Sequence, residues 1–169
     1  LQMTDQADSS KHLADATGFS QQSAVDDHLR SGVYFGNGVC MIILSLFPAR
    51  LLRFVEGMGF SADRRKGLEL LMRVGGWSKS QPKPSVSVEK EGIARSLCDV
   101  ALLSYHLILA ARIPVTDMDL AFADKVLSWN LQRYSQGTFF LYFSARLYAA
   151  QAIPEKAIEF YRNSIESQR

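Results

Sequence analysis

The chain contains 169 residues, of which 47% are hydrophobic and 21% are charged, and its formal net charge is +2. A chain with this much apolar material can bury the core of one domain, which excludes an intrinsically disordered protein. Its lysines and arginines are scattered along the sequence. This argues against a dedicated nucleic-acid surface, which would need clustered basic residues.

The N-terminal residues 1–21 are polar and rich in aspartate and serine, which predicts a flexible segment before a single helical domain over residues 22–169. The segment lacks the apolar stretch of a signal peptide. The most apolar run, residues 97–111, contains Asp99 and His106 and is too short to cross a bilayer. Because the sequence does not begin with methionine, we expect a fragment of a longer protein.

Residues 23–47 are predicted to form the first helix. It opens at Ser23 with acidic residues in its first turn, and apolar residues recur at helical spacing. They are Val33, Cys40, Leu44 and Phe47. Three glycines interrupt this pattern, at Gly32, Gly36 and Gly38. A phosphate-binding loop would need a third glycine at the right spacing and a preceding strand, so we attribute the glycines to close helix–helix approach.

Pro48 predicts the start of a second helix, which ends at Gly57–Gly59. One side of this helix is apolar and the other carries Arg50 and Arg53. The apolar stripe comprises Leu51, Leu52, Val55 and Met58.

Ser61 is the expected N-cap of a third helix, with Asp63 in its first turn. This helix should end at Gly75–Gly76. Its buried face is predicted to contain Leu68, Leu71 and Met72.

Residues 77–88 contain two prolines and four serines without a helical period, which predicts a solvated loop. A docking site for a proline-motif receptor is the alternative. The longest periodic stretch follows at residues 89–112 and ends before Pro114. We expect its buried face to contain Ile93, Leu97, Val100, Ala101, Tyr105 and Ile108.

Thr116 is the expected cap of the next helix, followed by Asp117 and Asp119 in its first turn. Gln136–Gly137 should close this helix. Its core face is predicted to comprise Leu120, Ala123, Leu127 and Leu131.

The final segment, residues 137–167, reads as two helices of similar length joined by a turn at Gln151–Pro154. Ala145 and Ala157 allow these helices to approach closely, and Tyr148 and Tyr161 are expected to fill the space between them. This spacing is typical of a tetratricopeptide (TPR) hairpin.

TPR units repeat about every 34 residues. Moving the hairpin back by one such period places Leu107, Ala111, Ala123 and Leu127 at equivalent positions, which indicates a degenerate earlier unit. The chain is therefore predicted to be all-α, with antiparallel helical hairpins in a TPR-like α-solenoid.

No catalytic or metal-binding constellation is recognisable in the sequence, so we expect no cofactor, no metal and no enzymatic activity. His12, His28 and His106 are too far apart to form a local metal pair, and His106 is expected to be a core or interface histidine. Cys40 and Cys98 are predicted to be buried, reduced thiols. A hydrolase using a cryptic cysteine or histidine is the least favoured hypothesis.

The favoured hypothesis is a non-enzymatic adaptor that binds proteins. On the first helix of the final hairpin, Phe139, Tyr142 and Arg146 occupy the positions that would line a TPR groove. Only Arg146 could pair with a carboxylate, so an apolar peptide is favoured over a chaperone C-terminus. Burial of the two rings against the preceding helices is favoured over a peptide-binding role for them. We also expect some self-association through apolar end faces.

The alternative hypothesis is a protein that binds lipids or sterols. In that case a cavity should be lined by Met41, Leu44, Phe47 and Tyr105.

Two blocks of the sequence resemble one family, which comprises tetratricopeptide repeat protein 39 and the fungal inclusion-body-clearance proteins. The first block begins at Gly32 and includes residues 44–48, 51–56, 59–61 and 63–71, and the second comprises residues 137–146 and 158–168. The resemblance covers roughly residues 29–168. Ala145 replaces a glycine that is usual in the family, and Cys40–Met41 replaces a more aromatic, asparagine-containing pair.

The resemblance implies a helical solenoid without a catalytic centre that acts as an adaptor. For fungal members it implies clearance of protein inclusions in association with lipid droplets, and for animal members adaptor-like roles in lipid regulation. It therefore implies protein partners and a location in the cytoplasm, with the nucleus and lipid droplets as further locations.

Overall fold

The computed structural model describes residues 25–112 and 118–168, and every regular element within these ranges is helical. The first helix occupies residues 25–44. The later elements are α2 (Ala49–Gly57), α3 (Arg64–Gly75), the 3₁₀ turn η1 (Val88–Lys90), α4 (Arg95–Ser104), the π-helix η2 (Tyr105–Leu109), α5 (Leu120–Arg133), α6 (Thr138–Ala150) and α7 (Pro154–Glu166). The predicted flexible segment 1–21 lies outside the described residues.

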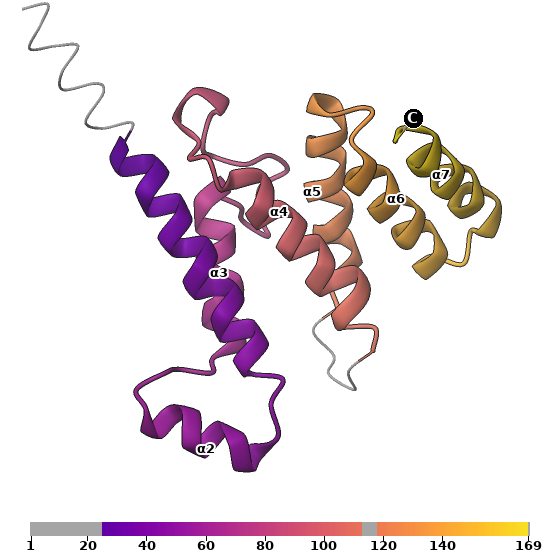
Figure 1. Cartoon of the computed structure of the whole chain (residues 1–169). Coiled ribbons are helices and arrows are strands. Elements are labelled where there is room, and N and C mark those ends of the chain that lie inside the picture. The colour runs from indigo at the N-terminus through magenta and orange to yellow at the C-terminus, as the bar shows by residue number, and fades with distance from the viewer. Residues whose placement is uncertain (1–24, 113–117, 169) are drawn as a thin grey trace, which may run out of the picture.

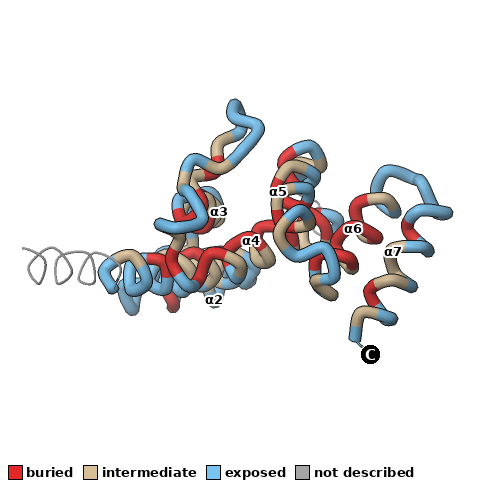
Figure 2. Tube along the Cα trace, turned by 90° about the horizontal axis from the view of Figure 1, so that it is seen from above, coloured by how far each residue is buried: buried red, intermediate tan, exposed pale blue. Residues whose placement is uncertain are grey.

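The helices follow one another as an array of antiparallel neighbours, so the predicted all-α, TPR-like architecture is confirmed (Figure 1). α3 packs on α4, and α5 packs on α4, on η2 and on α6, while α6 and α7 form the most closely packed pair. Buried residues concentrate on α3, α4, α5 and α6, whereas the first helix is largely exposed or half-buried (Figure 2). The core is therefore continuous along the array, as expected when each pair buries its apolar face on the next.

The first helix and α3 meet at a contact between two glycines. A Cβ atom added to Gly38 would lie 2.9 Å from the carbonyl oxygen of Gly67, and one added to Gly67 would lie 2.7 Å from that of Gly38. Both positions therefore require the absence of a side chain, as predicted for Gly38. The same explanation is wrong for Gly32 and Gly36, because a Cβ atom at either position would meet nothing within 4 Å.

The caps of α3 differ in part from the prediction. Asp63, not Ser61, is the N-cap, and its carboxylate accepts a hydrogen bond from the amide of Lys66 at 3.1 Å. Asp63 is the cap because its carboxylate can accept a hydrogen bond from the amide of Lys66, three residues later, which has no partner within the helix. At the other end Gly76 adopts φ of 61°, which terminates the helix as predicted.

α4 begins at Arg95, later than predicted, and only part of the predicted face is buried. Tyr105 lies in the core, and Val100, Ala101 and Ile108 are half-buried against it. Ile93 is 80% exposed and Leu97 is 52% exposed, so neither belongs to the core. The buried residues of α4 are Arg95, Cys98, Asp99, Leu102 and Leu103. The spacing of apolar residues did not predict this buried set, because α4 buries an arginine and an aspartate along with its leucines.

α5 begins at Leu120 and is capped by Asp119, whose carboxylate accepts a hydrogen bond from the amide of Phe122 at 2.9 Å. The predicted cap Thr116, together with Pro114 and Asp117, lies outside the described residues. Leu120 and Leu131 are only half-buried. The buried residues of α5 are Phe122, Ala123, Val126, Leu127 and Asn130.

The C-terminal hairpin is formed as predicted by α6 and α7, with Ala145 and Ala157 buried where the helices approach. As expected, both tyrosines pack between the two helices: Tyr148 stacks on Phe160 at 5.3 Å between ring centroids, and Tyr161 contacts Tyr142 at 5.8 Å. In the earlier unit, Leu107, Ala123 and Leu127 are buried as the repeat requires, whereas Ala111 is exposed.

Candidate functional site

An open groove lies between α3 and the start of α5, and we call it the α3–α5 groove. It has a volume of about 880 Å³. Its walls are formed by successive turns of α3, by part of the loop before α4, by one residue of η2 and by the start of α5. The lining residues are Arg65, Leu68, Glu69, Met72, Lys79, His106 and residues 118–122.

The floor of the groove is apolar and its rim carries charges of both signs. Leu68 and Met72 are half-buried on α3, and Phe122 is buried on α5, whereas Met118 is 43% exposed at the edge. Methionine is flexible and polarizable, so its side chain adapts to ligands of different shape. Such a lining can accommodate apolar side chains and hold polar groups at its edges.

Asp119 and Lys79 close one edge of the groove with an ion pair of 3.3 Å. Burial raises the pKa of Asp119, but the hydrogen bond from the Phe122 amide and the nearby ammonium of Lys79 outweigh this effect and hold the pKa below its usual range. The carboxylate is therefore charged at neutral pH. It joins the loop before α4 to the N-terminus of α5.

His106 forms part of the inner wall and belongs to the π-helix η2. It is buried, its Nδ1 accepts a hydrogen bond from the Asp119 amide at 3.2 Å, and its ring contacts the edges of Tyr105 and Phe122. A π-helical turn carries one more residue than an α-helical turn and often occurs at functional sites. Here it places the imidazole against the first turn of α5.

The loop between α3 and α4 is fastened to the body and is not simply solvated as predicted. The ammonium of Lys125 on α5 donates hydrogen bonds to the carbonyls of Ser78, Lys79 and Gln81 at 3.0, 3.1 and 2.8 Å. Trp77 at the start of the loop is buried. The loop that forms this part of the groove rim is therefore held in place by Lys125 and by the burial of Trp77.

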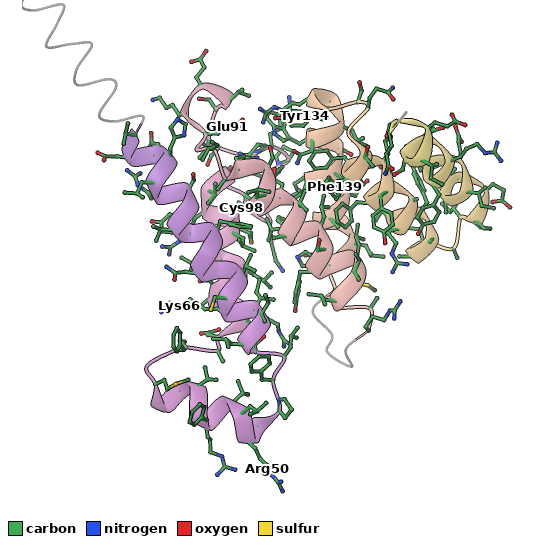
Figure 3. All side chains as sticks on the ribbon, in the orientation of Figure 1. Arg50, Lys66, Glu91, Cys98, Tyr134 and Phe139 are labelled. Carbon is green, nitrogen blue, oxygen red and sulfur yellow. The ribbon has the colours of Figure 1, made fainter. Side chains whose placement is uncertain are left out.

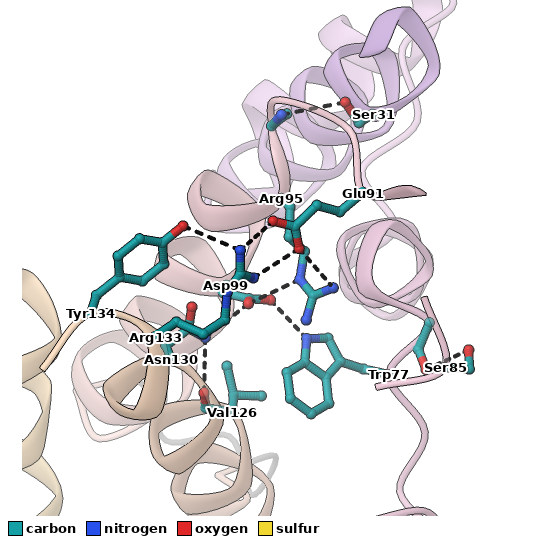
Figure 4. Close-up of polar contacts among 12 residues, drawn as sticks. Ser31, Trp77, Ser85, Glu91, Arg95, Asp99, Val126, Asn130, Arg133 and Tyr134 are labelled. Carbon is teal, nitrogen blue, oxygen red and sulfur yellow. Dashed lines mark hydrogen bonds and ion pairs between the residues drawn. The ribbon is translucent and has the colours of Figure 1, made fainter. Parts of the chain in front are cut away.

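Behind the groove lies a buried polar cluster, which consists of Trp77, Arg95, Asp99 and Asn130 (Figure 4). The Asp99 carboxylate accepts hydrogen bonds from Trp77 Nε1 at 2.7 Å, Arg95 Nε at 3.0 Å and Asn130 Nδ2 at 2.8 Å. Burial raises the pKa of Asp99, and the Arg95 charge with these three donors opposes that rise. One carboxylate thus connects the end of α3, α4 and α5.

A second ion pair extends the cluster toward solvent. Arg133 on α5 donates two hydrogen bonds to Glu91, one of them at 2.8 Å from Nη1 to Oε2. Hydrogen bonding to Glu91 raises the pKa of Arg133, so the guanidinium stays charged. The sequence pattern did not reveal this cluster. Its only signal was Arg95 and Asp99 at a spacing of four residues, which is usually an exposed pair.

The predicted partner-binding residues all lie on α6 but have different environments. Phe139 is 66% exposed, whereas Tyr142 is half-buried against Phe143 and Tyr161. Arg146 donates a hydrogen bond from Nη2 to the carbonyl of Leu107 in η2 at 3.0 Å. Only Phe139 therefore presents most of its side chain to solvent.

The four residues proposed for a lipid cavity do not line the α3–α5 groove. Tyr105 is buried in the core, Met41 and Leu44 are half-buried, and Phe47 is 39% exposed. Cys98 is buried as predicted, and burial raises the pKa of its thiol to about 12, so it is a poor nucleophile. The prediction was wrong for Cys40, which is exposed.

α2 projects from the array (Figure 1). It carries a surface that is both apolar and basic. Leu51, Phe54 and Met58 share one face and are 52%, 67% and 55% exposed. We call this face, together with Arg50 and Arg53, the α2 surface. Arg50 points away from the rest of the molecule (Figure 3). Among the residues of α2, only Val55 is buried.

Two absences hold for the part of the chain that the structure describes. It contains no group of three or more His, Cys, Asp or Glu side chains that could hold a metal ion. None of the described helices combines the length and the apolar character needed to traverse a bilayer.

Comparison with known proteins identifies the relatives of this chain. The family model described as Iml2/Tetratricopeptide repeat protein 39 matches residues 1–169. A curated relative, tetratricopeptide repeat protein ttc-39B of Caenorhabditis elegans, is 28% identical over 144 residues. The match covers 85% of this chain and 23% of the relative, so this chain spans about a quarter of that protein. No solved structure matches the chain.

Proposed function

Because the chain belongs to the Iml2/Tetratricopeptide repeat protein 39 family, we propose that it is a non-enzymatic adaptor whose α3–α5 groove binds a short apolar segment of a protein partner. The observation that carries this proposal is the groove itself, with an apolar floor and a rim of mixed charge. TPR-type arrays present such concave surfaces for binding other proteins.

The groove is suited to an extended peptide with one or two large apolar side chains. Leu68, Met72 and Phe122 offer apolar contact inside the groove. Arg65 and Glu69 can meet polar groups at its edge. Lys125 already holds the loop at the rim in place, so less conformational entropy is lost when a peptide binds.

The test is selection of peptides from a displayed random library against the wild-type chain, followed by titration with variants. Met118→Glu, at the edge of the groove, should weaken binding of the selected peptides by about tenfold or more, because it places a charge beside apolar side chains. Ile158→Glu is the matched control, since Ile158 is 59% exposed on α7. Equal affinity in both variants would contradict the groove.

Phe139, Tyr142 and Arg146 on α6 remain a second proposed partner-binding site. A substitution of Phe139 tests this site without removing other contacts described above. Phe139→Ala removes an exposed ring, whereas Arg146→Ala would also remove the hydrogen bond to Leu107. Loss of the selected peptides in Phe139→Ala but not in Met118→Glu would place the peptide site on α6. Tyr142→Ala alone cannot decide this, because its ring packs on Tyr161.

At the level of the cellular process, we propose that the adaptor acts in inclusion-body clearance or in protein quality control linked to lipid droplets. The family resemblance supports this, and so does the α2 surface. An apolar helical face flanked by arginines is the pattern of helices that lie in a membrane interface. The corresponding location is the cytoplasm and the droplet surface.

Sedimentation with lipid vesicles tests the contribution of the α2 surface. The wild-type chain should co-sediment with vesicles that contain phosphatidylserine, and Phe54→Glu should abolish this. Ile158→Glu again serves as the control, because it introduces the same charge at an apolar position of similar exposure, 59% against 67% for Phe54. Co-sedimentation that survives Phe54→Glu would contradict a lipid-facing role for α2.

A further inference from the structure

A second recess, separate from the α3–α5 groove, lies where the first helix, the end of α3 and the segment before α4 meet. It has a volume of about 260 Å³. Three cationic side chains line it, and each comes from a different segment: Arg30 from the first helix, Arg73 from α3 and Lys90 from η1. We call this recess the basic pocket.

The walls of the basic pocket are fixed to one another by hydrogen bonds. The amide of Ile93 donates to His28 Nδ1 at 3.1 Å, and the amide of Ala94 donates to Ser31 Oγ at 3.3 Å, which binds the segment before α4 to the first helix. Gly92 makes this approach possible, because a Cβ atom there would lie 2.1 Å from Ser31 Oγ.

The third wall is attached to the end of α3. The amide of Val86 donates to the carbonyl of Gly75 at 3.3 Å, and the amide of Ser85 donates to that of Gly76 at 3.1 Å. Val86 lines the pocket. The cations are therefore brought together by a fold that is already formed, which lowers the cost of ordering them around a ligand.

The charges of the pocket are not balanced within the described part of the chain. Arg73 and Lys90 have no ion pair or hydrogen bond from their side chains there. Arg30 pairs with Asp27 at 3.3 Å, and Asp27 is the only carboxylate among the described residues that line the pocket. Glu91, which follows Lys90, is already engaged by Arg133. Two positive charges thus remain without a counter-charge.

An anion with two charges and several acceptor oxygens matches this arrangement. A phosphate monoester carries a charge of about −1.5 to −2 at pH 7, and its three terminal oxygens accept strong hydrogen bonds. Arg73 can bind two of these oxygens through its planar guanidinium, and Lys90 can act as a point charge. The hydroxyl of Tyr34, which also lines the pocket, is a further donor.

We propose that the basic pocket binds a phosphate monoester, presented either by a small molecule or by a phosphorylated serine or threonine side chain. A recess between three segments favours such a group over a flat membrane surface. α2, whose apolar face is exposed, lies near the opposite end of the first helix (Figure 1). This inference does not depend on the α3–α5 groove.

Titration with O-phosphoserine and with inorganic phosphate, followed by backbone amide NMR shifts, tests the proposal. We expect saturable shifts at Gly92, Ile93 and Val86. The double variant Arg73→Gln/Lys90→Gln should bind O-phosphoserine more weakly by about tenfold or more, since it loses charged hydrogen bonds. The double variant Lys83→Gln/Arg162→Gln removes the same charge at exposed positions and should bind as the wild type does.

A phosphoserine peptide and its unphosphorylated form distinguish the two sources of the group. A peptide that binds more tightly than O-phosphoserine assigns the site to a phosphorylated protein, and equal affinity assigns it to small phosphate esters. The proposal is overturned if no probe gives saturable shifts, or if both double variants weaken binding equally. Binding to vesicles that contain phosphatidic acid, without binding to O-phosphoserine, would also overturn it.

Tyr34→Phe provides a variant that keeps the charge and the packing of the pocket. It should weaken O-phosphoserine binding several-fold if the hydroxyl donates to the phosphate, at unchanged helical circular dichroism. An unchanged affinity would remove Tyr34 from the site while the cation variants still decide the proposal.

Discussion

α4 and the α6–α7 hairpin are held in the array by different forces. α4 buries a charged pair, Arg95 and Asp99, whose partners come from the end of α3 and from α5. The hairpin instead closes on itself through small residues and stacked rings, such as Ala145 and Tyr148. The first arrangement connects distant segments and fails if one partner is lost, whereas the second is local and can absorb small changes.

The largest expected effect comes from breaking the charged pair. Asp99→Ala leaves the buried Arg95 guanidinium with only the longer ion pair to Glu91 at 3.9 Å, which should lower the free energy of unfolding by about 3–5 kcal/mol. Urea denaturation measures this value. The exposed Asp124 on α5 is the control, and Asp124→Ala should change stability by less than about 0.5 kcal/mol.

Cys98 reports independently on the same region. It is buried, and its pKa of about 12 leaves almost no thiolate in the folded protein at pH 8. A thiol reagent should therefore modify Cys40 and leave Cys98 unmodified, and Asp99→Ala should speed the modification of Cys98. If that rate stays the same, the cluster does not control the opening of α4.

A smaller effect is expected from overpacking the hairpin. Ala145 is fully buried where α6 meets its neighbours, so Ala145→Leu should cost about 1–3 kcal/mol. Ala149→Leu, at an exposed position on the same helix, is the matched control. Hydrogen exchange should increase in α7 more than in α4. A uniform increase throughout the array would show that the hairpin is not a local unit.

Loosening the loop before α4 should have a still smaller effect on global stability. Lys125→Met removes three hydrogen bonds to loop carbonyls and should cost about 1 kcal/mol, because the ammonium is partly hydrated. Trypsin should then cleave the loop after Lys79 faster than in the wild type. Lys156→Met, at an exposed position on α7, should leave this cleavage rate unchanged.

The smallest effect concerns Asp119, whose folded-state pKa is lowered. A depressed carboxyl pKa contributes stability above the unfolded pKa of about 4, and this contribution is lost as the pH falls through the folded pKa. The loss should be below about 1 kcal/mol, since the group is partly exposed. Asp119→Asn keeps a capping side chain and should remove this part of the pH dependence in thermal unfolding curves.

The hairpin could be predicted from the sequence because its contacts are local. Ala145 and Ala157 mark the close approach, and the turn before Pro154 marks the helix boundary. α2 and α3 were also predictable from Pro48 and from Gly76, since both residues restrict the backbone. Gly38 could be explained by packing before Gly67 was known as its partner.

The buried face of α4 and the candidate sites could not be predicted. A pattern of apolar residues does not include arginine or aspartate, so Arg95 and Asp99 were absent from the predicted buried face, which included the exposed Ile93. The α3–α5 groove joins residues far apart in the sequence, such as Met72 and Met118. Only the folded array brings these residues together, and no local motif marks them.

The π-helix η2 gives the chain one residue more than an α-helix of the same length would hold. Its closing hydrogen bond runs from the amide of Ala110 to the carbonyl of Tyr105 at 2.8 Å, five residues apart. Removing one residue here would restore the α-helical register and turn the preceding residues by about 100° relative to the following ones. His106 would then leave the wall shared with Asp119. Related chains that lack this residue should therefore keep the helix and lose that side of the groove.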